Sequence, residues 1–128
     1  MEPRTLRVLV ADDDRDTVHT LTVLLEGHGY TVHGVHSGKD VLVVAPIFRP
    51  DALILDIGMP GLDGYEVARR LRALKRERPL RIVAITGWGQ EADRARSREA
   101  GFDVHLVKPV DAGLLVRVLE ERNGATLH

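Results

Sequence analysis

Short runs of Val, Ile and Leu alternate along this chain with stretches in which apolar residues recur every three or four positions. This alternation is typical of buried parallel strands joined by crossover helices. The candidate strands are residues 6–11, 31–35, 52–56, 81–86 and 104–107. Right-handed crossovers between such strands favour an α/β fold with a doubly wound, five-stranded parallel sheet and five helices.

The spacing of apolar residues indicates which face of each helix should lie against the sheet. The stripes are Val18, Leu21, Leu24 and Leu25, then Val67, Leu71 and Leu74, and finally Leu114, Leu115, Val118 and Leu119. Ser37, Asp63 and Asp111 stand where N-caps are expected, and Gly101 where a C-cap is expected. Residues 90–100 offer only alanines at their apolar positions, so we expect the fourth helix to be the most loosely held.

Composition narrows the class of protein. A chain of 128 residues fits one domain, which we expect to span residues 1–123 before a short C-terminal tail at 124–128. With 18 basic and 19 acidic residues, the formal charge of -1 provides no bulk attraction to nucleic acid or to anionic membranes. The absence of cysteine excludes thiol chemistry, and no signal peptide or membrane span is visible, so we expect a cytoplasmic protein.

Polar side chains stand at the ends of four predicted strands. The first strand is followed by Asp12, Asp13 and Asp14, the third ends on Asp56, the fourth ends on Thr86, and the fifth is followed by Lys108 and Pro109. Because doubly wound sheets bind ligands at the carboxyl ends of their strands, we expect these groups to share one rim.

The chemistry of that rim favours phosphoryl transfer. Clustered carboxylates repel one another unless a hard cation neutralises them, and Mg²⁺ suits an oxygen-rich site of this kind. The chain has neither a Ser-His-Asp arrangement nor a phosphate-binding glycine loop, which leaves a carboxylate nucleophile as the simplest interpretation. A metal, a lysine and a hydroxyl around it would stabilise the charge on a transferred phosphoryl group.

Four segments together resemble the receiver domain of two-component response regulators. They are residues 8–14 (Val-Leu-Val-Ala-Asp-Asp-Asp), 56–66 (Asp-Ile-Gly-Met-Pro-Gly-Leu-Asp-Gly-Tyr-Glu), 85–87 (Ile-Thr-Gly) and 107–109 (Val-Lys-Pro). The resemblance covers nearly the whole chain and implies a flavodoxin-like strand order, 2-1-3-4-5. Residues 101–111 are also similar to receivers attached to hybrid sensor histidine kinases.

The resemblance assigns a role to each residue of the rim. It implies that Asp56 is the phosphoacceptor, that Asp12 and Asp13 place Mg²⁺ together with Asp56, and that the backbone carbonyl of Gly58 is a further ligand. Asp14 occupies a more variable position in the family and is left out of the predicted site. The domain would be a signalling phosphoacceptor and not an enzyme, apart from catalysing its own phosphorylation and dephosphorylation.

The resemblance also implies a switch and its partners. Lys108 would pair with the phosphoryl oxygens and Thr86 would turn its hydroxyl toward them, moving the face formed by the fourth helix, the fifth strand and the fifth helix. The phosphoryl donor would be a histidine kinase or a histidine phosphotransfer protein, and the reader a downstream protein effector. Neither nucleic acid nor a membrane is expected as a direct partner.

Three positions depart from the family pattern or bear on its kinetics. Receivers commonly carry Tyr or Phe where this chain has His105, so the coupling of this residue to Thr86 could be weaker or pH-dependent. Gly58 and Trp88 stand where the family tunes hydrolysis of the acyl phosphate, and neither readily orients water, which predicts a long-lived phosphoryl group. Receivers often have a cis peptide bond before Pro109, which the sequence leaves open.

Other functions fit the sequence less well. The main alternative is a receiver-like interaction module regulated without phosphorylation, against which the intact set of functional residues argues. A flavin or dinucleotide binder would need a glycine loop where the three aspartates lie. A haloacid-dehalogenase-like phosphatase needs a second aspartate where Gly58 stands, and the histidines at 33 and 36 lack the company of a zinc site.

Overall fold

The computed structural model describes residues 5–74, 79–87 and 94–121, except for the side chain of Arg94. The described residues form a parallel sheet in the order β2-β1-β3-β4-β5, which confirms the predicted topology. The strands are β1 (Arg7–Ala11), β2 (Thr31–Val35), β3 (Ala52–Asp56), β4 (Arg81–Thr86) and β5 (Val104–Val107). The helices are α1 (Arg15–Gly27), α2 (Gly38–Phe48), α3 (Gly64–Ala73), α4 (Arg94–Ala100) and α5 (Ala112–Glu120).

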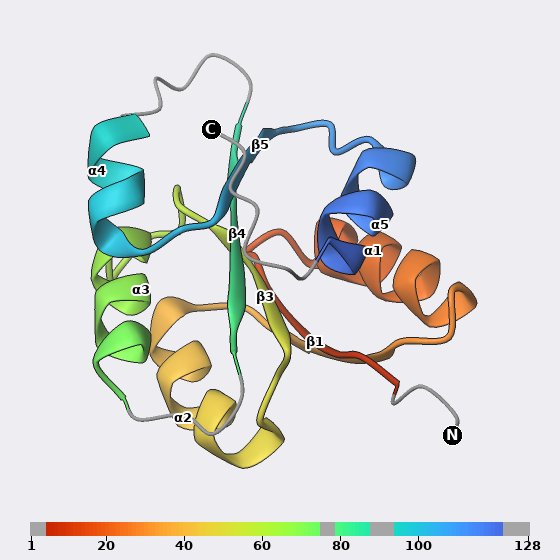
Figure 1. The fold of residues 1–128 in the computed structure, drawn as a ribbon, viewed down its shortest axis with the longest axis horizontal. Coiled ribbons are helices and arrows are strands. Elements are labelled where there is room, and N and C mark those ends of the chain that lie inside the picture. The colour runs from red at the N-terminus through yellow and green to blue at the C-terminus, as the bar shows by residue number, and fades with distance from the viewer. Residues whose placement is uncertain (1–4, 75–78, 88–93, 122–128) are drawn as a thin grey trace.

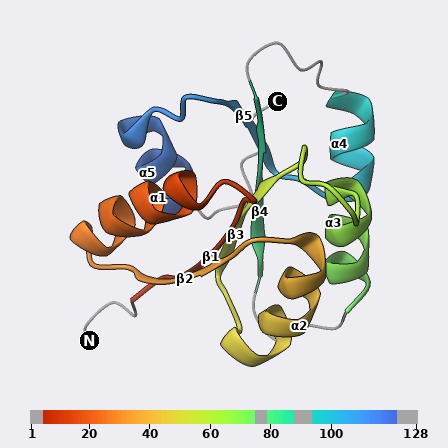
Figure 2. The same ribbon diagram turned by 180° about the vertical axis from the view of Figure 1, so that it is seen from behind.

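Helices cover both faces of the sheet. Figure 1 shows α1 and α5 on one face and α2, α3 and α4 on the other, and Figure 2 shows the same layers from behind. The buried side chains accordingly form two cores. The first includes Leu9, Leu53, Val67, Leu71 and Phe102, and the second includes Val10, Ile54, Leu25, Leu115 and Leu119. Burial on both faces explains why the strands read as continuous apolar runs.

Capping side chains begin the helices where the sequence predicts. Ser37 accepts a hydrogen bond from the backbone N–H of Asp40, and Asp111 accepts one from Leu114. Asp63 accepts one from Tyr65 and begins α3. Each cap satisfies an N–H that the first helical turn leaves without an intrahelical partner.

Two predictions about the C-terminal ends of helices, at Gly101 and at Leu74, had different outcomes. Gly101 follows α4 with φ +103°, the left-handed backbone expected of a glycine C-cap. Leu74, in contrast, was expected on the sheet-facing stripe of α3, and this prediction is wrong because its side chain is 50% exposed. The helix ends at Ala73, and the extended backbone of Leu74 turns its side chain away from the buried face.

Helix α4 buries little, as its alanine-only pattern predicts. In its described part, the buried side chains are those of Ser97 and Ala100, whereas α3 buries Tyr65, Val67 and Leu71 among others. The first part of the predicted segment, residues 90–93, lies outside the described residues. Within the described chain, no helix combines the length and the apolar character needed to cross a bilayer.

Candidate functional site

The carboxyl ends of β1 and β3 bring three aspartates together. These strands pair directly, with Ala11 opposite Leu55, so the residues that follow them meet at one edge of the sheet. Asp12, Asp13 and Asp56 each offer a carboxylate oxygen, and these oxygens lie within 4.8 Å of one another. Hard carboxylate oxygens at this spacing could hold a metal ion with a preference for oxygen ligands.

Lys108 enters the same cluster from the end of β5. Its Nζ lies 2.8 Å from Oδ2 of Asp12 and 3.4 Å from Oδ2 of Asp56. Both aspartates are nearly inaccessible, with exposed fractions of 1% and 5%. The ammonium group therefore partly compensates two buried negative charges, which would otherwise be costly to hold together.

Charge and burial shift the ionisation of Asp56 and Lys108 in the same direction. Burial, together with the nearby charge of Asp12, raises the pKa of the Asp56 carboxyl, although the N–H of Gly58 and the charge of Lys108 oppose this. Burial alone would lower the pKa of Lys108, but its hydrogen bond to Asp12 and the charge of Asp56 raise it overall. The cluster thus retains excess negative charge, which a bound cation would relieve.

The loop after β3 fixes the orientation of the Asp56 carboxylate. The backbone N–H of Gly58 donates to Oδ1 of Asp56 at 2.8 Å. The other carboxylate oxygen, Oδ2, faces Lys108. The side chain is thereby held by both of its oxygens. The role of the Gly58 carbonyl as a metal ligand stays a prediction.

The side chain of Asp14 serves the helix, whereas its backbone N–H donates to Oδ1 of Asp12 at 2.9 Å. The carboxylate of Asp14 accepts hydrogen bonds from the N–H of Asp16 at 3.0 Å and from the hydroxyl of Thr17 at 2.9 Å. These bonds, that of Thr17 first, lower the pKa of the Asp14 carboxyl. Asp14 is therefore the N-cap of α1, which is consistent with leaving it out of the predicted site.

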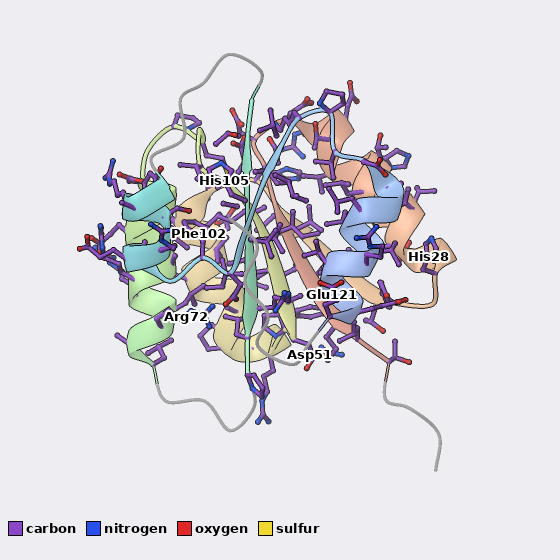
Figure 3. The ribbon with its side chains drawn as sticks, turned by 45° about the horizontal axis from the view of Figure 1, so that its top comes forward. His28, Asp51, Arg72, Phe102, His105 and Glu121 are labelled. Carbon is purple, nitrogen blue, oxygen red and sulfur yellow. The ribbon has the colours of Figure 1, made fainter. Side chains whose placement is uncertain are left out.

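Thr86 and His105 lie on adjacent strands and contact each other. The Thr86 hydroxyl is 3.2 Å from Nε2 of His105, and both side chains are buried. Thr86 follows Ile85, the residue of β4 that pairs with Asp56. His105 lies on the face of the sheet covered by α4, as strand alternation predicts (Figure 3). A pH-dependent coupling between the two residues stays a prediction.

Sequence reasoning missed one residue at this edge. His36 follows β2, and its Nδ1 lies 3.1 Å from the backbone carbonyl of Asp12. The signal that could have found it is its position, because β2 is parallel to β1 and the end of β2 lies at the same edge of the sheet.

Two further positions were left open by the sequence. The peptide bond between Lys108 and Pro109 is cis. Trp88 lies outside the described residues, so slow hydrolysis of an acyl phosphate also stays a prediction.

A groove of about 470 Å³ opens beside Lys108, between α1 and the loop after β5. Its lining combines apolar, hydroxyl-bearing and charged side chains: Asp16, Thr17, Thr20, Leu21, Lys108, Pro109 and Val110. A second molecule seated in this groove would lie next to the aspartate cluster.

Comparison with known proteins agrees with this geometry. Residues 8–120 match the family model described as the response regulator receiver domain. The chain is 41% identical over 105 residues to the response regulator MprA of Mycobacterium ulcerans, a match that covers 82% of this chain and 44% of MprA. It is 32% identical over 113 residues to the protein PilH of Pseudomonas aeruginosa, covering 88% of this chain and 93% of PilH.

Solved structures give the same result. A putative response regulator from Chloroflexus aurantiacus matches with a TM-score of 0.81 and 32% identity, over 91% of this chain and 98% of that one. The chain thus spans less than half the length of MprA, but nearly the whole of PilH and of the Chloroflexus protein.

Proposed function

The chain belongs to the response regulator receiver domain family, which makes it a phosphoacceptor of two-component signalling, and we propose that its acceptor group is the carboxylate of Asp56. The observation that carries the proposal is the position of Asp56: it is buried between two further carboxylates, with Lys108 reaching its outer oxygen. Asp12 shares these neighbours, but it follows β1, whereas Asp56 ends β3, the middle strand of the sheet, with its carboxylate oriented by the N–H of Gly58.

We propose Mg²⁺ as the metal of this site. Asp12, Asp13 and Asp56 would hold it through carboxylate oxygens, and the carbonyl of Gly58 would add a backbone oxygen. When bound, the ion would neutralise negative charge on the aspartates and on the phosphoryl oxygens. The raised pKa of Asp56 is consistent with this proposal, because it reflects burial of the carboxylate first and the nearby charge of Asp12 second, and a bound divalent cation would offset both.

In the proposed reaction, a carboxylate oxygen of Asp56 attacks the phosphorus of a phosphohistidine. A new P–O bond forms as the P–N bond of the donor breaks, and the donor imidazole leaves with the bonding electron pair and takes up a proton. Lys108 would then pair with the phosphoryl oxygens, and Thr86 would donate its hydroxyl to them. For Thr86 this requires its hydroxyl to leave the present contact with His105.

The partners follow from this chemistry. A histidine kinase or a histidine phosphotransfer protein would present its phosphohistidine at the rim, with its surface against the groove between α1 and the loop after β5. The added phosphoryl group brings about 1.5 to 2 negative charges at neutral pH, so the rim must rearrange to accommodate it. We propose that α4, β5 and α5 form the face that a protein effector reads.

Phosphorylation of purified variants tests the function. Incubated with acetyl phosphate and Mg²⁺, the wild type should gain the mass of one phosphoryl group, and Asp56→Asn should gain none. Asp14→Asn is the matched control, since it removes one negative charge next to the site and asparagine still caps a helix. A wild type that stays unmodified would favour an interaction module regulated without phosphate.

A further inference from the structure

Helix α4 is fixed at its C-terminal end and, among its described side chains, that of Arg96 fastens it nearer its N-terminus. We propose that the fixed end, at Arg72 and Gly101, is a pivot, and that Arg96 on Asp63 and Tyr65 is a latch that holds α4 in the unphosphorylated position. The proposal rests on the phosphoacceptor function, to which it adds the contacts that set the resting position of the switching helix.

The pivot is a cluster of hydrogen bonds around one guanidinium group. Arg72 of α3 donates from Nε and Nη2 to the carbonyl of Gly101, at 2.9 and 2.7 Å, and from Nη1 to the carbonyl of Leu80 at 2.6 Å. It also forms an ion pair with Asp103 at 2.7 Å. Asp103 in turn accepts the N–H of Ile82, so the end of α4 is tied to α3 and to β4.

Packing strengthens the same end. Phe102 is 3% exposed and its backbone N–H donates to the carbonyl of Ser97. Its ring meets that of Tyr65 edge-on, at a centroid distance of 6.0 Å and an angle of 86°. Figure 3 shows Arg72 and Phe102 on the α4 side of the sheet. This end of α4 is therefore difficult to move without breaking buried contacts.

The latch lies nearer the N-terminus of the same helix and holds it against the start of α3. Nη2 of Arg96 is 2.8 Å from Oδ2 of Asp63, and its guanidinium carbon lies 4.1 Å from the centre of the Tyr65 ring. The two charged side chains are 46% and 45% exposed, so the contact can open into water without uncovering a buried charge. An exposed ion pair with a ring contact is a weak and reversible link, unlike the pivot.

A weak link matters here because, in the described part of the chain, little else holds the part of α4 that lies away from the pivot. Among its described residues, α4 buries only the small side chains of Ser97 and Ala100. Little buried apolar area therefore opposes a displacement of its N-terminal part. The Arg96 contact supplies much of the remaining resistance to this displacement. A small change in the free energy of this contact would shift the population of the two positions of α4.

The latch is also attached to the phosphorylation site. Asp63 ends the loop that begins directly after Asp56, and its other oxygen, Oδ1, caps α3 by accepting the N–H of Tyr65. The start of the same loop contacts the Asp56 carboxylate through the N–H of Gly58. A rearrangement around a phosphorylated Asp56 would thus reach Asp63 through residues 57–62, and a shift of Asp63 away from Arg96 would loosen their contact.

Hydrogen exchange of the full chain, without Mg²⁺ or phosphate, tests the latch first. In Arg96→Gln, the amides of residues 97–100 should exchange about three- to tenfold faster than in the wild type, the range expected for losing an exposed ion pair and a ring contact. Arg98→Gln is the matched control, with the same charge change on an exposed neighbour that makes no ion pair or ring contact with a described residue. It should leave these rates unchanged.

Beryllofluoride, a phosphoryl mimic, tests what the latch does. If the latch favours the unphosphorylated position, Arg96→Gln should bind beryllofluoride with Mg²⁺ a few-fold more tightly than the wild type. Asp63→Asn keeps the cap of α3 and should give a similar gain, and combining it with Arg96→Gln should add little, because both remove one contact.

The outcomes separate the latch from the phosphoacceptor function. Unchanged exchange in Arg96→Gln, or an equal change in Arg98→Gln, would overturn the latch. Faster exchange with unchanged or weaker beryllofluoride binding would overturn its assignment to the resting position. A wild type that fails to bind beryllofluoride would contradict the proposed function, while the exchange experiment would still decide whether Arg96 holds α4.

Discussion

The hydroxyl of Thr86, the last residue of β4, lies 3.2 Å from Nε2 of His105 in the adjacent strand β5, and both side chains are buried. A switch that turns this hydroxyl toward a phosphoryl group on Asp56 must break the contact. In the proposed switch, the strength of this contact would therefore oppose the movement of Thr86.

His105→Phe should lower the free energy of unfolding by about 1–3 kcal/mol, because it removes a ring nitrogen next to a buried hydroxyl. The same substitution in a Thr86→Val background should be less costly, since no hydroxyl then remains. Urea unfolding of the two single variants and the double variant measures this difference. His19→Phe, at an exposed position of α1, is the control, and additive effects of the two buried substitutions would contradict the contact.

Lys108→Gln should destabilise the metal-free protein by about 1–3 kcal/mol, because Asp12 and Asp56 lose a charged hydrogen-bond partner. Addition of Mg²⁺ should then stabilise this variant more than the wild type, since the ion would meet less competing positive charge. Thermal unfolding with and without Mg²⁺ gives both values. Lys39→Gln, on the exposed side of α2, should change neither, and an equal loss there would count against a specific role of Lys108.

Asp56→Asn should stabilise the metal-free protein at pH 7. The folded protein raises the pKa of this carboxyl above its ordinary value of 3.8, so the folded state binds the proton more tightly than the unfolded state does. Stability should consequently fall as the pH rises from about 3.8 through the raised pKa, and the variant should lose this dependence.

Unfolding curves of both proteins between pH 3 and pH 8 measure the effect described for Asp56. The two proteins should have the most similar stabilities at the acid end, where the carboxyl is protonated in both states. Mg²⁺ at neutral pH should stabilise the wild type more than Asp56→Asn. A wild type that gains stability across this range relative to the variant would contradict the sign of the shift.

Gly101→Ala should lower the free energy of unfolding by about 1–3 kcal/mol, because its φ of +103° is unfavourable for a residue with a Cβ. The added carbon would also lie 2.6 Å from Cγ of Arg72 and disturb the pivot of α4. Urea unfolding measures the loss. Gly27→Ala is the control, since a Cβ there meets nothing within 4 Å, and an equal loss at both positions would argue against a strained turn.

The strands and caps could be predicted because local sequence determines them. Apolar runs of strand length and capping residues such as Ser37 and Asp63 act on their immediate neighbours. The convergence of Asp12, Asp56 and Lys108 was also predictable, since the ends of parallel strands meet at one edge of the sheet. These features depend on periodicity and topology alone.

Contacts between distant side chains could not be predicted in this way. The pair of Arg96 and Asp63 joins residues 33 positions apart, and nothing in the pattern of either helix selects this partner. The contact between His36 and the carbonyl of Asp12 depends on the rotamer of one ring. Leu74 was misplaced because periodicity does not show at which residue α3 ends.

Reductive trapping of the phosphorylated protein tests the central proposal most directly. Borohydride converts an aspartyl phosphate to homoserine, which peptide mass spectrometry locates along the chain. After treatment with acetyl phosphate and Mg²⁺, we predict homoserine at position 56, and a strong reduction of the product when Mg²⁺ is removed with a chelator. Homoserine at position 12 or 13 instead, or product at position 56 that does not depend on Mg²⁺, would contradict the account.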